Sequence, residues 1–278
     1  MRVLVTSILL VGCLRPNENY VPEDLRISGP DLAETVICKE HRQKMISAPR
    51  AYFKMGSNVE MTEQPIHDQR VLDMLIDPME VTVSQYRACV EAGTCSPPAV
   101  SAGCNWGING RDNYPVNCVT YEQATQYCAS VCARLPTEIE WEYAARGSMN
   151  SVYPWGNEAP GTAGKDYTRA CLSDQTCPVG QFASTALGAP ATPGLFDMAG
   201  NVWEWTSSPW PCKYPLDHND PTCGGLPSDS QRVVRGGYVY NLPASSLRSA
   251  YRLPRDQASQ ASYVGIRCAA TPPMAPTS

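Results

Sequence analysis

The sequence has few histidines and few phenylalanines, and it has no long run of basic or apolar residues. Its three histidines, His41, His67 and His218, lack the spacing of metal ligands, which argues against a histidine-based zinc or iron site. The 22 Lys and Arg residues form no basic run, and the formal net charge is -5. We therefore expect no nucleic-acid partner.

Phenylalanine occurs only 3 times, whereas glycine occurs 20 times and proline 25 times. This composition is typical of a loop-rich globular protein with limited regular secondary structure. The 278 residues, 43% of them hydrophobic, are enough for one large domain or two small ones. Because no internal repeat or linker divides the chain, we expect a single domain over residues 36–270.

Cysteine, by contrast, is abundant, and its 13 occurrences indicate an oxidising compartment. The segment Met1–Gly12 has one positive charge followed by an apolar run that is too short to span a bilayer, as in a signal peptide. Leu10-Val11-Gly12-Cys13 resembles a bacterial lipobox, in which the cysteine is acylated. The alternatives are a truncated strand or a misplaced start.

These N-terminal features predict a protein anchored by lipid in the bacterial cell envelope, in the periplasm or at the outer-membrane surface. A signal peptide would cover residues 1–12, Cys13 would carry the lipid, and residues 13–35 would form a polar tether. The tail over residues 271–278 is expected to be disordered. Without Cys13, twelve cysteines remain, an even set for six disulfides.

Three threonines mark helix starts. Thr82, Thr120 and Thr137 are each followed three residues later by Gln or Glu, the pattern of a capping box. They predict helices that run to about Glu91, to about Cys132 and to Arg146. The other predicted elements are a helix over 36–44, a strand that ends in a turn over 51–57, and strands over 71–76, 201–206, 231–235 and 263–268.

The stretch 194–210, GLFDMAGNVWEWTSSPW, holds three of the six tryptophans. Asp197 and Glu204 flank the pair Gly200-Asn201, which permits positive φ and a sharp turn. Two carboxylates with convergent carbonyl oxygens suit a hard cation such as calcium. The alternative is a tight turn held by buried tryptophans, with both acids in solvent.

Several motifs in one order resemble the formylglycine-generating-enzyme, or sulfatase-modifying-factor, family. The resemblance covers about residues 46–270 and implies an irregular α+β fold with little secondary structure, rich in disulfides here and distantly related to C-type lectins. The residues that carry it are Glu80-Val81-Thr82, Arg134-Leu135-Pro136-Thr137-Glu138, Glu140-Trp141-Glu142-Tyr143, Tyr153-Pro154-Trp155-Gly156-Asn157, Gly194–Trp205, Arg232-Val233-Val234-Arg235-Gly236-Gly237 and Gly265-Ile266-Arg267-Cys268.

The resemblance implies a structural calcium site and one disulfide. Its calcium ligands would be Asp197, the carbonyls of Gly200 and Val202, and Glu204. Its disulfide would join Cys128 to Cys268. The remaining cysteines suggest the pairs Cys89–Cys95, Cys104–Cys118, Cys171–Cys177, Cys212–Cys223 and Cys38–Cys132, which sequence alone cannot prove.

Catalysis in the family needs two cysteines that hold Cu(I) shortly after the Gly-Gly pair. Here those positions fall on Asn241 and on Ala244 or Ser246, and Tyr238 replaces a serine. The sequence has no cysteine between Cys223 and Cys268, so we expect no copper and no catalytic residue. The rest of the groove would consist of Tyr238, Asn241, Arg248, Tyr251 and Arg252, whose arginines either clamp a partner or form ordinary ion pairs.

We therefore expect a domain that binds a protein or peptide partner, or acts as a scaffold, in the envelope without catalysis. The alternative is an oxidoreductase that forms formylglycine from a protein or peptide cysteine by another route, or performs a related oxidation.

Overall fold

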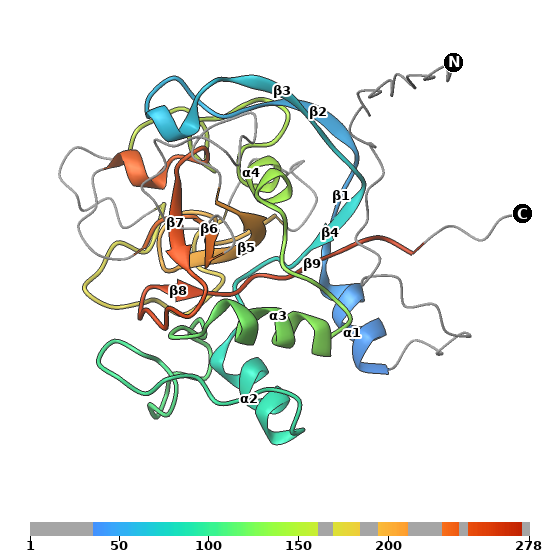
Figure 1. The fold of residues 1–278 in the computed structure, drawn as a ribbon, viewed down its shortest axis with the longest axis vertical. Helices are drawn as coiled ribbons and strands as arrows, with labels where there is room; N and C mark the ends of the chain where they lie inside the picture. Colours follow the sequence, from blue (N-terminus) through green and yellow to red (C-terminus); the bar gives the residue numbers. More distant parts are fainter. Residues whose placement is uncertain (1–35, 161–168, 184–193, 211–229, 239–243, 274–278) are drawn as a thin grey trace, which may run out of the picture. The chain divides into compact units, whose positions relative to one another are not determined.

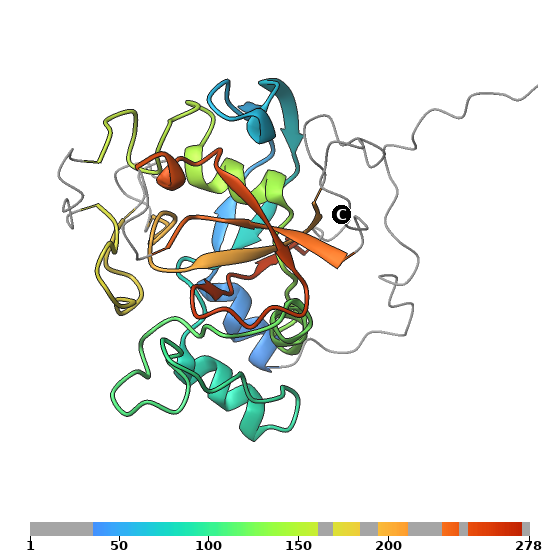
Figure 2. The same ribbon diagram turned by 60° about the vertical axis from the view of Figure 1, so that its left-hand side comes forward.

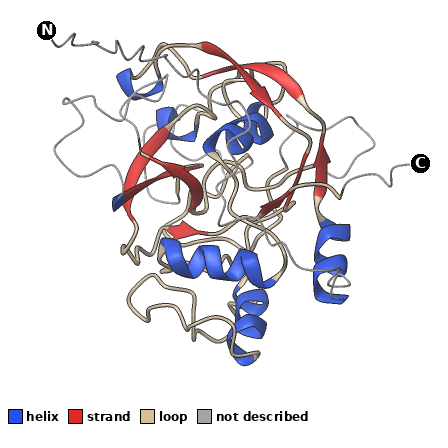
Figure 3. Cartoon of the chain, turned by 45° about the vertical axis from the view of Figure 1, so that its right-hand side comes forward, coloured by secondary structure: helices blue, strands red, loops and turns tan. Residues whose placement is uncertain are grey.

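The computed structural model describes residues 36–160, 169–183, 194–210, 230–238 and 244–273 (Figure 1). The fold is of the α+β class, as predicted, and loops connect short helices and strands throughout (Figure 3). None of the helices described has the length and apolar character needed to cross a membrane. Cys13, Asn241 and the last residues of the predicted tail lie outside the described residues.

The helices begin where the capping boxes predict. Helix α2 covers Val83–Glu91, α3 covers Tyr121–Ser130 and α4 covers Glu138–Arg146, and each is preceded by a threonine in a complete capping box. Helix α1 covers Val36–Lys44, and two 3₁₀ turns, η2 and η4, cover Met61–Glu63 and Ala244–Leu247. Helix α3 ends before the predicted Cys132, whose φ of 57° is left-handed and incompatible with a continuing helix.

The central sheet has the strand order β7-β6-β5-β8. Strands β5 (Trp203–Pro209), β6 (Gln231–Arg235) and β7 (Arg252–Asp256) are antiparallel, and β8 (Val264–Gly265) pairs with β5 in parallel. Figures 1 and 2 show α4 on one side of this sheet and α3 on the other. We call these sides the α4 face and the α3 face.

Two smaller sheets complete the domain. Strands β1 (Ile46–Ala48), β4 (Met74–Ile76) and β9 (Ala269–Ala270) form one, and β2 (Ala51–Met55) pairs with β3 (His67–Val71) in the other. The predicted strand over 71–76 is thus wrong, because the chain changes sheets between β3 and β4. Asp73 in this break binds the Arg50 side chain at 2.8 Å.

Five disulfides join ten described cysteines. Cys128–Cys268 links α3 to the C-terminal part of the chain and closes a separation of 140 residues. The predicted pairs Cys38–Cys132, Cys89–Cys95, Cys104–Cys118 and Cys171–Cys177 are also present, and Cys212 and Cys223 lie outside the described residues. A disulfide between residues far apart in the sequence, such as Cys128–Cys268, stabilises a loop-rich domain because it restricts the unfolded chain.

Candidate functional site

The segment Asp197–Trp205 lies at the centre of the domain. Gly200 and Asn201 both have positive φ, 84° and 60°, so the predicted turn is present. Successive side chains of β5 point to opposite faces of the sheet, and Trp203 and Trp205 belong to the hydrophobic core on the α3 face. Glu204 points to the α4 face, where the indole Nε1 of Trp141 donates a hydrogen bond to it at 2.6 Å.

Glu204 is fully buried and paired with Arg267. The Nε of Arg267 lies 3.0 and 2.9 Å from the two carboxylate oxygens, and its Nη2 lies 2.8 Å from Oε1. Because a buried charge is tolerated only when it is paired, this bond fixes the C-terminal strand region to β5. The alternative reading of the sequence, with both acids in solvent, is therefore wrong.

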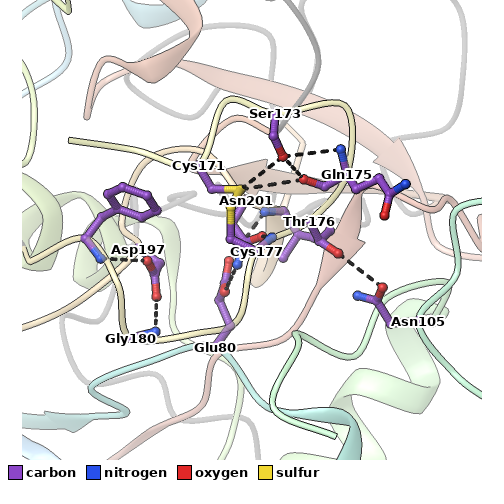
Figure 4. Close-up of a disulfide and its surroundings, with 12 residues drawn as sticks. Glu80, Asn105, Cys171, Ser173, Gln175, Thr176, Cys177, Gly180, Asp197 and Asn201 are labelled. Atoms are coloured by element: carbon purple, nitrogen blue, oxygen red, sulfur yellow. Dashed lines mark hydrogen bonds between the residues drawn. A yellow bond between two sulfur atoms is a disulfide. The ribbon is translucent and has the colours of Figure 1, made fainter. Parts of the chain in front are cut away.

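Asp197 is also buried, close to the Cys171–Cys177 disulfide (Figure 4). Its carboxylate accepts hydrogen bonds from the backbone N–H groups of Gly180 and Phe182. Burial raises the pKa of the Asp197 carboxyl above its ordinary value, although these N–H groups and Arg267 favour the ionised form. Asp197 thus holds the 180–182 loop against the turn.

Glu80 is a third buried acid near this turn (Figure 4). The side-chain amide of Asn201 donates to it at 2.6 Å. Burial, together with the neighbouring charges of Asp197 and Glu204, raises the pKa of the Glu80 carboxyl well above its ordinary value. No sequence signal assigns Glu80 to this group, because it lies 121 residues before Asn201 along the chain.

The predicted calcium ligands are only partly arranged for a cation. Asp197 and Glu204 lie in one buried acidic region, which favours a positive charge. Both oxygens of Glu204, however, already accept bonds from Arg267 or Trp141. Within the described residues, no three His, Cys, Asp or Glu side chains form a metal-binding group. Calcium at Asp197, Gly200, Val202 and Glu204 stays a prediction.

The α4 face also contains a chain of alternating buried charges. Arg235 donates to Glu142 at 2.8 Å and to Glu138 at 3.2 Å. Arg252 donates to Glu138 at 2.8 Å, and Arg146 donates to Glu142 at 2.7 Å. This network joins helix α4 to strands β6 and β7 and neutralises every member through a neighbour.

The two arginines predicted for the groove belong to such buried pairs. Arg248 forms two bonds to Glu63, at 3.0 and 2.7 Å, and is 6% exposed. Arg252 is 1% exposed, and its guanidinium also lies over the ring of Trp210 at 4.6 Å. Neither side chain is therefore available to clamp a partner, and the ion-pairing alternative is the correct one for both.

A pocket of about 240 Å³ opens instead on the α3 face. It contains three predicted site positions, Tyr238, Ser246 and Tyr251. The Tyr238 ring lies 4.9 Å from the ring of Tyr263. The described residues that line it are Trp203, Tyr238, Ser246, Tyr251, Leu253, Arg255 and Tyr263. We call this the aromatic pocket.

Sequence reasoning missed Trp203, Leu253, Arg255 and Tyr263 as pocket residues. The alternation of β7 could have placed Leu253 and Arg255 on one face, but only the register with β6 shows which face that is. Of the remaining predicted positions, Ala244 lies in η4, and Asn241 lies outside the described residues.

Comparison with known families identifies the domain. The sulfatase-modifying factor enzyme 1-like domain matches residues 33–272. The chain belongs to this family. This confirms the resemblance on which the expected fold depends, while the kinship to C-type lectins stays a prediction.

Three relatives have different names, and their alignments cover different shares of this chain. The formylglycine-generating enzyme of Thermomonospora curvata is 29% identical, and the alignment covers 84% of this chain and 95% of that protein. The hercynine oxygenase of Mycolicibacterium thermoresistibile is 39% identical over 56% of this chain, which is 35% of its own length. The inactive C-alpha-formylglycine-generating enzyme 2 of Bos taurus is 33% identical over 60% of this chain and 54% of its length.

Two solved structures share the fold. PvdO from Pseudomonas aeruginosa superimposes with a TM-score of 0.64 and 24% identity, covering 81% of this chain and 93% of that one. Treponema denticola variable protein 1 has a TM-score of 0.61 and 22% identity, covering 82% and 95%. At these identities the likeness concerns the fold alone.

Proposed function

We propose that this sulfatase-modifying-factor-like domain is a non-catalytic binding module of the bacterial cell envelope that holds a protein or peptide partner in the aromatic pocket. One observation carries the proposal: a pocket lies at Tyr238, Ser246 and Tyr251, three of the positions that the resemblance gives, but the thiols needed for copper are missing from the sequence around it. No cysteine occurs between Cys223 and Cys268, and Cys268 is bonded to Cys128. A sulfur in a disulfide is not a thiolate ligand.

One relative, the bovine inactive C-alpha-formylglycine-generating enzyme 2, is inactive by name. Loss of the chemistry is thus compatible with retention of the domain. Aromatic rings and one arginine around a small cavity are typical of recognition sites, because rings bury a large area at low entropic cost.

The alternative function is an oxidation of a protein or peptide cysteine, or of a smaller molecule. It is favoured by the relatives named formylglycine-generating enzyme and hercynine oxygenase. A metal for such chemistry would need ligands other than thiolates in the pocket. Neither described histidine is among the lining residues of the pocket, and His41 contacts Asp77 at 3.0 Å while His67 contacts the carbonyl of Pro65 at 2.9 Å.

The envelope location rests on the sequence and on the number of disulfides. Five disulfides are typical of a protein that folds in an oxidising compartment. The same proposal makes Cys13 the lipidated residue. Mass spectrometry of the mature protein from a bacterial host should find acylated Cys13 at its N-terminus, and a mature protein that retains Met1 contradicts the anchor.

The test of non-catalysis incubates a sulfatase-type peptide with the full chain, copper and reductant. We expect no mass change of the peptide, since no described thiol is available to hold Cu(I). A matched variant, Asn241→Cys with Ser246→Cys, restores two thiols at the positions that the family resemblance gives. This variant, and not the wild type, should compete with bicinchoninate for Cu(I). Turnover by the wild type would establish the oxidase and overturn the proposal.

A further inference from the structure

Strands β6 and β7 place two arginines directly opposite each other on the α3 face. Arg232 and Arg255 are partners in the register, and Arg255 lines the aromatic pocket. The Arg232 guanidinium lies 4.8 Å from the ring centre of Tyr121, and that of Arg255 lies 4.9 Å from Tyr263. The tyrosine rings thus orient both guanidinium groups, that of Arg255 in the pocket lining and that of Arg232 on the neighbouring strand.

Among the residues that the structure describes, no carboxylate pairs with either of these two positive charges. Among the described residues neither guanidinium forms an ion pair, and each has a buried Nε without a hydrogen-bond acceptor. The adjoining acids, Glu122 and Asp256, make no ion pair with them, and Asp256 accepts a bond from the backbone of Ala258 instead. Like charges directly opposite on a sheet are destabilising, so this arrangement is costly unless an anion joins it.

The same two strands provide an internal comparison. Arg235 and Arg252 are also direct partners, three residues along each strand, and they lie on the α4 face. There Glu138 binds both guanidinium groups, at 3.2 and 2.8 Å. The described part of the domain therefore neutralises one arginine pair with its own acid and provides no acid for the pair that includes the pocket residue Arg255.

We infer that Arg232 and Arg255 bind a carboxylate of an acidic peptide segment whose neighbouring apolar side chain enters the aromatic pocket. Planar guanidinium groups match carboxylate oxygens in paired hydrogen bonds. A volume of about 240 Å³ is below the roughly 300–1,000 Å³ typical of small-molecule sites. It suits one side chain of a larger ligand better than a whole small molecule. The inference rests on the proposed binding function and names the chemistry of its partner.

The experiment presents the full chain, fluorescently labelled, to an array of random-sequence peptides. We expect the bound peptides to be enriched in Asp or Glu next to Phe, Tyr or Leu. Arg255→Gln and Arg232→Gln should each weaken binding of the selected peptides by about tenfold, the effect of removing one charge-assisted hydrogen bond. Arg50→Gln, at an exposed arginine whose side chain is 70% accessible, is the matched control and should bind like the wild type.

Each other outcome has a definite meaning. If peptides bind without acidic enrichment and lose binding on Tyr238→Ala, the pocket binds but the anion inference is overturned. If no peptide binds, while sulfate or phosphate raises the Tm of the wild type and not of Arg255→Gln, a small oxyanion replaces the peptide and the inference is again overturned. Conversion of a peptide cysteine would instead overturn the proposed function. Thermal unfolding of both arginine variants at or above the wild-type Tm shows that lost binding is not lost folding.

Discussion

The two faces of the central sheet differ in how their arginine charges are stabilised. On the α4 face, arginines and glutamates alternate through the interior, and each described charge has a partner. On the α3 face, aromatic rings and apolar side chains fill the interior, and the arginines at its edge rest on tyrosine rings. On the α4 face every buried arginine therefore has an acidic partner among the described residues, whereas the α3 face holds an arginine pair that no described acid neutralises.

The largest expected effect concerns the covalent support of the α3 face. Replacing Cys128 and Cys268 with alanine should lower the free energy of unfolding by about 5 kcal/mol, because this disulfide closes a separation of 140 residues. Removing Cys89–Cys95, which closes only 6 residues, should cost about 2 kcal/mol and is the control. Urea denaturation measures both. Equal losses would show that local packing, and not chain restriction, sets the contribution.

The next largest effect is expected when one acid is removed from the ion-pair network of the α4 face. Glu142→Ala leaves Arg235 and Arg146 with fewer partners inside the domain. We expect a loss of about 3–5 kcal/mol, because an uncompensated buried charge is strongly destabilising. Denaturation midpoints at constant salt measure it. A loss below about 1 kcal/mol would mean that water or a rearranged acid replaces Glu142, and the two faces would then differ less than the structure indicates.

Calcium tests whether the α4 face is truly complete. If calcium binds at Asp197 and Glu204, a concentration 100-fold above its Kd should add about 2.7 kcal/mol to stability. Thermal melts with calcium and with chelator should therefore differ for the wild type and coincide for Glu204→Gln. Coinciding melts for the wild type would leave Arg267 as the sole counter-charge of Glu204 and would remove calcium from this domain.

The smallest effect is expected at the unneutralised pair. Arg255→Gln should change the free energy of unfolding by less than about 1 kcal/mol, with a gain favoured, since it relieves a like-charge contact. Arg252→Gln, three residues earlier on the same strand, should be clearly destabilising because it leaves Glu138 with one partner fewer. Chemical denaturation of the two variants measures the contrast. Equal losses at the two positions would contradict the distinction between the faces.

The sequence predicted local features well and distant partners poorly. The capping threonines located the three helices, and the Gly200-Asn201 pair located the central turn, because both signals act within a few residues. The burial of Arg248 and Arg252 was not readable, since their acids, Glu63 and Glu138, lie 185 and 114 residues away. The family resemblance supplied the Cys128–Cys268 bridge, which spacing alone could not.

The position of the last strands has a consequence for the timing of folding. Residues 264–270 supply β8 to the central sheet, β9 to a sheet made by the first strands, Arg267 to buried Glu204 and Cys268 to the longest bridge. A nascent chain that has emerged only to residue 260 lacks all four contacts. Because these four contacts all need the last strands, and contacts between distant residues form slowly, the domain closes only after its final strand has reached the compartment where it folds. Until then the unfolded chain is accessible to the chaperones and proteases of that compartment.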